Sequence, residues 1–230
     1  MYPGGKNAPG TYQTIINQIP PHDIYVEAFL GSGAVMRHKA PAPLANIGID
    51  SDAGAIQALG KPPRHHTFLH TDALKWIAEN AYGYKPLNNK KTFLYLDPPY
   101  LFSTRRTHRR IYRCELSNDD HRRLLDLIQD LPCMVAISGY WSEMYANALE
   151  GWRAIQFQAM TRGGAPATEW LWMNYPEPWE LHDYRYLGEN FRKREQIKRK
   201  KERWRKRLQA MTLLERYAVL DAIESLRPTG

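Results

Sequence analysis

Strand-like and helix-like segments alternate through the first 175 residues of the chain, and this alternation constrains the fold more than any other feature. Short runs rich in Ile, Val, Phe, Leu and Tyr are typical of strands, and turns or helical patterns follow them. Strands that alternate with helices form a doubly wound, parallel-based sheet. We therefore predict an α/β domain with strands near residues 24–29, 45–50, 67–70, 93–96, 134–138, 154–159 and 169–174.

Residues able to bind a ligand follow four of these predicted strands. Phe29-Leu30-Gly31-Ser32-Gly33 follows the first, Asp50 closes the second, Asp72 follows the third and Asp97-Pro98-Pro99-Tyr100 ends the fourth. Ligands of open α/β sheets bind at the carboxyl ends of the strands. We expect these four features to line one cleft.

The glycine turn and the acids suggest a nucleoside ligand. Gly31 and Gly33 allow close approach to the backbone, and Asp50 can accept hydrogen bonds from ribose hydroxyls. Met36 replaces the third glycine of the dinucleotide fingerprint, which favours a nucleoside without pyrophosphate. Taken singly, Asp50 and Asp72 are better explained as helix N-caps than as ligand-binding residues, and the glycines are explained equally well as a tight turn.

The tetrapeptide Asp97-Pro98-Pro99-Tyr100 carries the most specific chemistry. The exocyclic amino group of a base is a poor nucleophile because its lone pair is conjugated with the ring. The Asp97 carboxylate and the Pro98 carbonyl can accept its two N–H bonds and favour a localised lone pair, while the prolines fix the backbone. Tyr100 can stack on a base that has left the duplex.

The ordered motifs resemble those of Dam-like, S-adenosylmethionine-dependent DNA adenine-N6 methyltransferases. They include Tyr2-Pro3-Gly4-Gly5-Lys6, Glu27-Ala28-Phe29-Leu30-Gly31-Ser32-Gly33, Asp50, Asp72, Asp97-Pro98-Pro99-Tyr100, Ser138-Gly139-Tyr140 and Glu169-Trp170-Leu171-Trp172-Met173-Asn174-Tyr175. The resemblance covers about residues 1–176. It implies a Rossmann-like, doubly wound mixed sheet of the class I methyltransferase type, with about seven strands.

The resemblance also implies roles for individual residues and an adenine-specific DNA methyltransferase activity by base flipping and direct displacement. Asp97, Pro98, Pro99 and Tyr100 would hold the target adenine. The residues implied at the S-adenosylmethionine site are Tyr2, Gly4, Gly5, Lys6, Glu27, Phe29, Gly31, Gly33, Asp50 and Asp72. N4-cytosine methylation remains an alternative, because the same acceptors suit either amine. A second alternative is a non-catalytic DNA-binding protein that retains the fold.

Positive charge is concentrated near the C-terminus. Between Arg185 and Arg207, twelve Lys and Arg residues stand against three Glu, a net of +9, whereas the rest of the chain carries 20 basic and 21 acidic residues. Such a local excess is typical of an element that binds a polyanion. We expect Lys198, Arg199, Lys200 and Lys201 to contact DNA phosphates; a surface or dimer-forming helix is the alternative.

A second basic cluster follows the tetrapeptide. Only residues 73–96 separate Asp72 from Asp97, which leaves no room for the recognition domain that larger family members insert there. We therefore expect residues 101–116 to form a DNA-contacting loop at the mouth of the cleft. Its arginines are Arg105, Arg106, Arg109, Arg110 and Arg113.

These patterns predict a methyltransferase domain at residues 1–180 and a basic helical extension at 181–230. Apolar runs stay far below the 18 residues of a membrane span, and the N-terminus lacks the apolar region of a signal peptide, so we expect a cytoplasmic protein of a prokaryotic or phage-infected cell, monomeric or homodimeric. The two cysteines, Cys114 and Cys133, fit neither a zinc knuckle nor a redox motif, and no metal is expected.

Overall fold

The structure, a computed structural model, describes residues 5–83, 85–105, 111–160 and 166–227. The predicted site residues Tyr2, Gly4, Arg106, Arg109 and Arg110 lie outside the described residues. The described residues up to Tyr184 form one compact unit, and those from Arg185 form a second.

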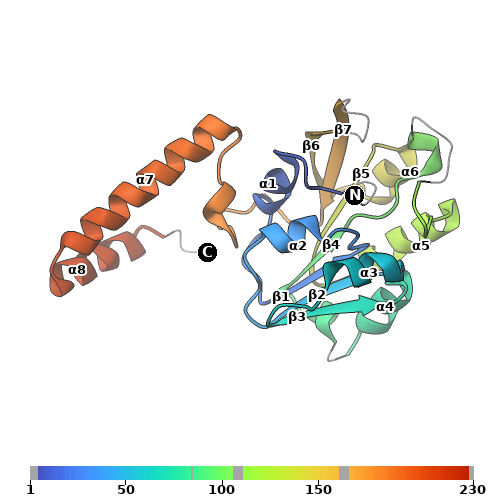
Figure 1. Ribbon diagram of the computed structural model, residues 1–230, viewed down its shortest axis with the longest axis horizontal. Helices are drawn as coiled ribbons and strands as arrows, with labels where there is room; N and C mark the ends of the chain where they lie inside the picture. The colour runs from blue at the N-terminus through green and yellow to red at the C-terminus, as the bar shows by residue number, and fades with distance from the viewer. Residues whose placement is uncertain (1–4, 84, 106–110, 161–165, 228–230) are drawn as a thin grey trace. The chain divides into compact units, whose positions relative to one another are not determined.

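A seven-stranded mixed sheet is the centre of the first unit (Figure 1). Its order is β3-β2-β1-β4-β5-β7-β6; β7 is antiparallel to both of its neighbours, and the other pairs are parallel. The predicted doubly wound α/β fold of the Rossmann-like type is confirmed. The strands are β1 Ile24–Ala28, β2 Ala45–Asp50, β3 His66–His70, β4 Thr92–Leu96, β5 Met134–Gly139, β6 Arg153–Met160 and β7 Pro166–Met173.

Helices connect the strands and lie against both faces of the sheet. They are α1 Thr11–Ile16, α2 Ala34–His38, α3 Ala53–Leu59, α4 Ala73–Asn80, α5 Asn118–Gln129 and α6 Glu143–Ala148, with short 3₁₀ turns at Pro86–Asn88, Phe102–Thr104 and Tyr184–Tyr186. The longest of them, α5, starts at a capping box in which Ser117 accepts from the Asp120 amide and Asp120 accepts in return.

The central strand β4 shows why the sheet needs cover on both sides, since all five of its residues are buried. Leu94 and Leu96 belong to the main hydrophobic core, together with apolar residues of α4 and α5. Alternation turns Phe93 and Tyr95 to the other face, where Phe93 packs against Tyr25. A strand buried on both faces is apolar throughout, and this explains the continuous run Phe93 to Leu96.

The parallel strands bring their carboxyl ends to one edge of the sheet. The segments after β1, β2 and β4 meet there because β1 pairs with both β2 and β4 in register, Ala28 lying opposite Ile49 and Leu96. Strand β7 runs antiparallel to β5, and its Trp170 pairs with Gly139 at the end of β5. This part of β7 therefore lies at the same edge. This edge holds the residues of the candidate site.

The second unit contains the two helices α7 Phe191–Ala210 and α8 Leu213–Glu224. Thr212 caps α8 in a capping box with Glu215. No described residue of either helix is buried. No helix among the described residues combines the length and the apolar character that crossing a membrane requires.

Candidate active site

The turn after β1 has an unusual backbone. Phe29, Gly31 and Gly33 all have positive φ angles, of 61°, 51° and 61°. Glycine adopts this conformation freely, but in a residue such as Phe29 it costs ~1–3 kcal/mol of strain. The turn is held by the Gly33 amide, which donates to the Leu30 carbonyl at 2.7 Å. Strained backbone of this kind is common at ligand sites. The sequence predicts a ligand site at this turn.

Asp50 braces this turn from the end of β2. Its Oδ2 accepts from the Gly31 amide at 2.7 Å and its Oδ1 from the Asp52 amide at 2.7 Å. The residue is only 4% exposed, and burial raises its pKa while the two amides act to lower it. Asp52, not Asp50, caps the next helix, α3. The N-cap alternative therefore does not apply to Asp50.

Asp72 caps a helix, as the alternative interpretation of the sequence proposes. It is the N-cap of α4, and its side chain accepts from the Lys75 amide at 2.7 Å. It is not among the described residues that line the pocket next to Asp50. The structure thus brings Asp50 and the glycine turn together, and the cofactor role of Asp72 remains a prediction.

Asp97 lies where β4 ends, and its side chain is 17% exposed. Oδ1 accepts from the Ser138 hydroxyl at 2.8 Å, and the Tyr100 hydroxyl lies 3.5 Å from it. The Lys6 ammonium lies 2.8 Å from the same oxygen. All three of these groups, from Ser138, Tyr100 and Lys6, contact Oδ1. No described residue donates a hydrogen bond to Oδ2, so its lone pairs can accept one from a ligand.

Lys6 lies between two carboxylates. Its ammonium is 3.1 Å from Oε2 of Glu169, a β7 residue, in addition to its contact with Asp97, and it hydrogen-bonds the Tyr100 hydroxyl. Burial alone would lower the pKa of Lys6, but the charges of Asp97 and Glu169 outweigh burial and raise it well above the usual value. Lys6 is therefore a fixed cation, 3% exposed, within an acidic site.

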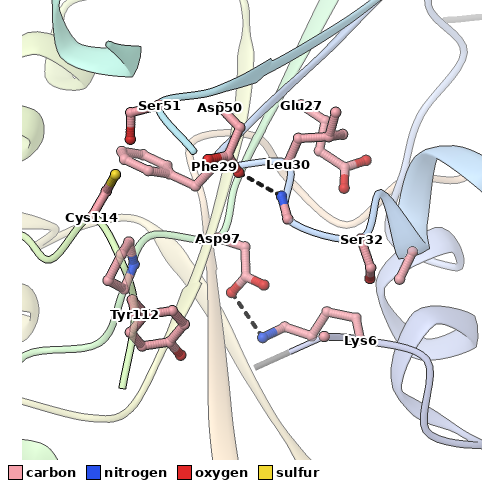
Figure 2. Close-up of a pocket in the computed structure, with 14 residues that line it drawn as sticks. Lys6, Glu27, Phe29, Leu30, Ser32, Asp50, Ser51, Asp97, Tyr112 and Cys114 are labelled. Carbon is pink, nitrogen blue, oxygen red and sulfur yellow. Dashed lines mark hydrogen bonds and ion pairs between the residues drawn. The ribbon is translucent and has the colours of Figure 1, made fainter. Parts of the chain in front are cut away.

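A pocket joins these groups at the carboxyl edge of the sheet (Figure 2). Tyr112 and Cys114 form one wall, and Glu27 and Ser32 lie on the opposite side. Its described lining consists of Gly5, Lys6, Glu27, Phe29, Leu30, Gly31, Ser32, Ala34, Asp50, Ser51, Asp97, Pro99, Tyr112 and Cys114. Of the remaining predicted site residues, Pro98 and Tyr100 are buried beside it, and Gly33 begins α2.

Glu27 links the pocket to α2. Its Oε2 accepts from the Met36 amide at 2.7 Å and from the Tyr25 hydroxyl at 2.8 Å. Burial is the largest influence on this group and raises its pKa to about 8, although both hydrogen bonds act in the opposite direction. Met36, at the position of the missing third glycine, therefore supplies a backbone donor that Glu27 uses.

Arg105 differs from the expectation that it contacts DNA. Its guanidinium is buried, makes a two-pronged ion pair with Glu115 and donates from Nε to the Tyr100 carbonyl at 2.6 Å. These partners take three of its five N–H donors and the side chain is buried, so we correct its role to a structural one. Arg113 is exposed and lies 3.5 Å from Asp52.

The predicted phosphate-contacting residues Lys198, Arg199, Lys200 and Lys201 are all exposed on α7. An exposed position is required for the contact that we predict, and the contact itself remains a prediction. Among the described residues, no three His, Cys, Asp or Glu side chains gather closely enough to hold a metal ion.

Three residues of the site carry no role in the sequence-based prediction: Glu169, Tyr112 and Glu115. Glu169 interrupts an apolar strand, and a charged residue at a buried strand position is a usable signal of pairing. Glu115 is the first acid after five arginines, which is a weaker signal. Tyr112 has no distinguishing pattern of its own.

A scan of protein-family models finds no match to this chain, and neither does a search of curated proteins. Solved structures with some likeness include precorrin 8w decarboxylase from Methanobacterium thermoautotrophicum, with 14% identity, a TM-score of 0.47, and 75% of this chain and 92% of that chain covered. The N-methyltransferase NodS from Bradyrhizobium japonicum has 13% identity, a TM-score of 0.47 and coverage of 71% and 94%. A dimethyladenosine transferase from Plasmodium falciparum has 14% identity, a TM-score of 0.44 and coverage of 73% and 62%. Likenesses of this size do not assign a reaction or a cofactor to the chain.

Proposed function

We propose that this chain is an S-adenosylmethionine-dependent DNA methyltransferase that methylates the N6 amino group of adenine. The observation that carries the proposal is the arrangement of Asp97. One oxygen of its carboxylate is held by Lys6 and Ser138, and the other accepts no hydrogen bond from the described residues. The group lines the pocket that Asp50 and the strained Phe29 turn also line.

The residues of the pocket fit S-adenosylmethionine. Asp50 is a buried carboxylate held by two backbone amides, and its remaining lone pairs suit ribose hydroxyls. The described lining includes the carboxylates of Asp50 and Asp97, and its ammonium, Lys6, is paired with Asp97 and with Glu169. When bound, S-adenosylmethionine supplies an electrophilic methyl group on a positively charged sulfur, and this acidic lining suits that charge.

Asp97 would act on the target amine. Its Oδ2 can accept one N–H bond and the Pro98 carbonyl the other, which localises the nitrogen lone pair. Burial raises the pKa of Asp97 and the charge of Lys6 lowers it. Burial has the larger effect, so the pKa of Asp97 lies above its ordinary value. In its ionised form the carboxylate accepts hydrogen bonds, and the raised pKa suits it to take the proton that the amine loses once the new N–C bond has formed.

Tyr100 would hold the base. Its hydroxyl binds Lys6, and its ring meets the ring of Tyr140 edge-on with centroids 4.5 Å apart. Both contacts fix the ring beside Asp97 before any base arrives, which lowers the cost of ordering it at the moment of binding.

The test is methyl transfer with a labelled cofactor. The purified chain is incubated with labelled S-adenosylmethionine and duplex DNA of mixed sequence, and the methylated nucleoside is identified by mass spectrometry. We expect N6-methyladenine from the wild type and none from Asp97→Ala. Asp119→Asn, which changes an exposed carboxylate on α5, is the matched control.

Other outcomes decide between the alternatives. N4-methylcytosine would replace the adenine assignment with the cytosine one. In a parallel reaction with RNA in place of DNA, label in the RNA but none in the DNA would change the substrate class. No label above the Asp97→Ala background would leave a non-catalytic fold and overturn the proposal.

A further inference from the structure

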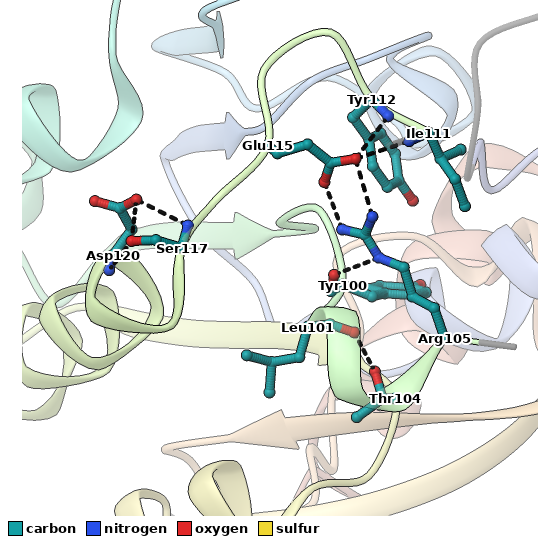
Figure 3. A network of polar contacts seen from close by, with 9 residues as sticks. All are labelled: Tyr100, Leu101, Thr104, Arg105, Ile111, Tyr112, Glu115, Ser117 and Asp120. Atoms are coloured by element: carbon teal, nitrogen blue, oxygen red, sulfur yellow. Dashed lines mark hydrogen bonds and ion pairs between the residues drawn. The ribbon is translucent and has the colours of Figure 1, made fainter. Parts of the chain in front are cut away.

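Glu115 is the centre of a buried polar network beside the Asp97-Pro98-Pro99-Tyr100 motif (Figure 3). Its Oε1 accepts from the amides of Ile111 and Tyr112 at 2.8 and 3.0 Å, and from Nη1 of Arg105 at 2.9 Å. Its Oε2 accepts from Nη2 of Arg105 at 2.5 Å. One carboxylate thus receives four donors from two segments of the chain.

The Arg105 guanidinium carries the network to the motif. Its third donor, Nε, binds the Tyr100 carbonyl at 2.6 Å. Its Cζ atom lies over the rings of Phe102 and Tyr112, at 4.3 and 5.2 Å from their centroids. Arg105 therefore touches the main chain of the motif at one end and the side chain of Tyr112 at the other.

Tyr112 carries the network to the pocket, whose wall it forms together with Cys114. The main chain of Tyr112 is held by Glu115 and its ring by Arg105. The wall of the pocket and the main chain of the motif are thus joined through two charged side chains.

The ends of this segment are also held. After the motif, the Thr104 hydroxyl donates to the Leu101 carbonyl at 2.9 Å and closes a 3₁₀ turn. After Glu115, Ser117 and Asp120 begin α5 with their capping box. The described flanks of the segment are therefore both held by local hydrogen bonds.

We propose that Glu115 is a positioning residue that couples the two ligand sites, so that a nucleoside ligand against Tyr112 and a base against Tyr100 strengthen each other's binding. The inference rests on the proposed function and adds a residue to it. The Arg105 and Glu115 side chains are 4% and 9% exposed, so neither charge has a ready alternative partner in water. Removal of either Arg105 or Glu115 leaves the other charge without its partner, and the link between the nucleoside site and the base site is lost.

Binding equilibria test the coupling without requiring turnover. The affinity for S-adenosylhomocysteine is measured by calorimetry with and without saturating duplex DNA, and the ratio of the two affinities is the coupling factor. We expect a factor of about 5–150 for the wild type, the usual range of coupling between two sites. In Glu115→Gln the factor should fall toward 1, and by linkage the effect of S-adenosylhomocysteine on DNA affinity should fall equally.

Two further variants make the test decisive. Arg105→Lys keeps the charge but removes the forked geometry, so it should also reduce the factor. The double variant Arg105→Met with Glu115→Gln leaves no buried unpaired charge, so it should fold even where Glu115→Gln does not, and it should show no coupling. Asp119→Asn breaks the exposed ion pair with Arg122 and should keep the wild-type factor.

The outcomes separate this inference from the proposed function. An unchanged coupling factor in the folded variants would overturn the inference. The same holds if the affinities for S-adenosylhomocysteine with and without DNA decrease equally, because an unchanged ratio indicates a purely structural role. Methyl transfer by a wild type without coupling would overturn the inference and leave the function standing. A wild type that neither binds S-adenosylhomocysteine nor transfers methyl groups would overturn both.

Discussion

Lys6 and Asp97 form a buried ion pair, with 2.8 Å between the ammonium nitrogen and Oδ1 of the carboxylate. Glu169 contributes a second carboxylate at 3.1 Å, so the cation is shared between β4 and β7. Charge attraction in a buried site is strong, and an unpaired charge there is costly. The pair therefore helps to orient Asp97 and lowers the pKa of its carboxyl group against the larger effect of burial.

Replacement of Lys6 by Met should reduce methyl transfer at pH 7.5 by about 100-fold or more, the usual scale for removal of a fixed charge at a reacting centre. Without the ammonium, the pKa of Asp97 rises, because the charge that lowers it is gone while burial and Glu169 remain. The acidic limb of the pH–kcat profile should therefore move to higher pH, with partial recovery of activity in alkaline buffer. An unshifted profile would show that Lys6 does not control Asp97. Lys75→Met, at an exposed position on α4, is the control.

The Asp50→Asn and Asp72→Asn variants should have different effects. Asp50 lines the pocket, so its variant should raise KM for S-adenosylmethionine by about 10-fold or more with a smaller change in kcat. Asp72 caps α4, and Asn also caps well, so its variant should change neither KM nor stability by much, whereas Asp72→Ala should lower stability by about 1 kcal/mol. Steady-state kinetics and urea unfolding measure these effects. A raised KM in Asp72→Asn would restore this residue to the cofactor site.

Stability should depend on pH through Glu27, whose pKa burial raises to about 8 in the folded state. Between the ordinary value near 4.5 and 8, the folded chain keeps a proton that the unfolded chain has released. The free energy of unfolding therefore decreases as pH rises through this window, by up to ~1.4 kcal/mol per pH unit. Urea unfolding from about pH 5 to about pH 8.5 should show a shallower decrease for Glu27→Gln. Glu79→Gln, at an exposed position, should follow the wild type, and parallel curves for all three proteins would contradict the assignment.

Replacement of Lys198, Arg199, Lys200 and Lys201 by Gln should weaken DNA binding at low salt and flatten its salt dependence. For every phosphate that the variant no longer neutralises, the slope of log K against log salt should become shallower by about 0.9. The preference among DNA sequences should not change, because phosphates carry no sequence information. The matched control replaces the exposed lysines Lys61, Lys85, Lys90 and Lys91 of the first unit. Equal slopes in both variants would remove α7 from the DNA interface.

Much of the candidate site could be predicted because it follows strand ends. The carboxyl ends of parallel strands meet at one edge, so Phe29, Asp50 and Asp97 are predictable as neighbours once their strands are assigned. Asp72 shows the limit of this argument. The same position after a strand is also the start of a helix, and a carboxylate there serves the nearest amide first.

Charge patterns located the basic segments but not the state of each side chain. Five arginines near the motif suggest an exposed cluster, and Arg113 is exposed. Arg105 is instead buried, because Glu115 and the Tyr100 carbonyl satisfy its donors. Whether a charged side chain faces solvent or a partner depends on tertiary neighbours that local composition does not encode.

By itself the sequence determined the order of strands and helices, the helix caps and the glycine and proline turns, because these depend on residues close together in the chain. Only the tertiary structure decided that Lys6 lies between Asp97 and Glu169, since β7 runs antiparallel beside β5 and brings a distant acid to the edge where β4 ends. It likewise joined Arg105 to Glu115 and left Asp72 at its helix cap. A charged side chain that is buried without a partner is costly, and the tertiary packing, not the spacing of residues along the chain, decides which partner it meets.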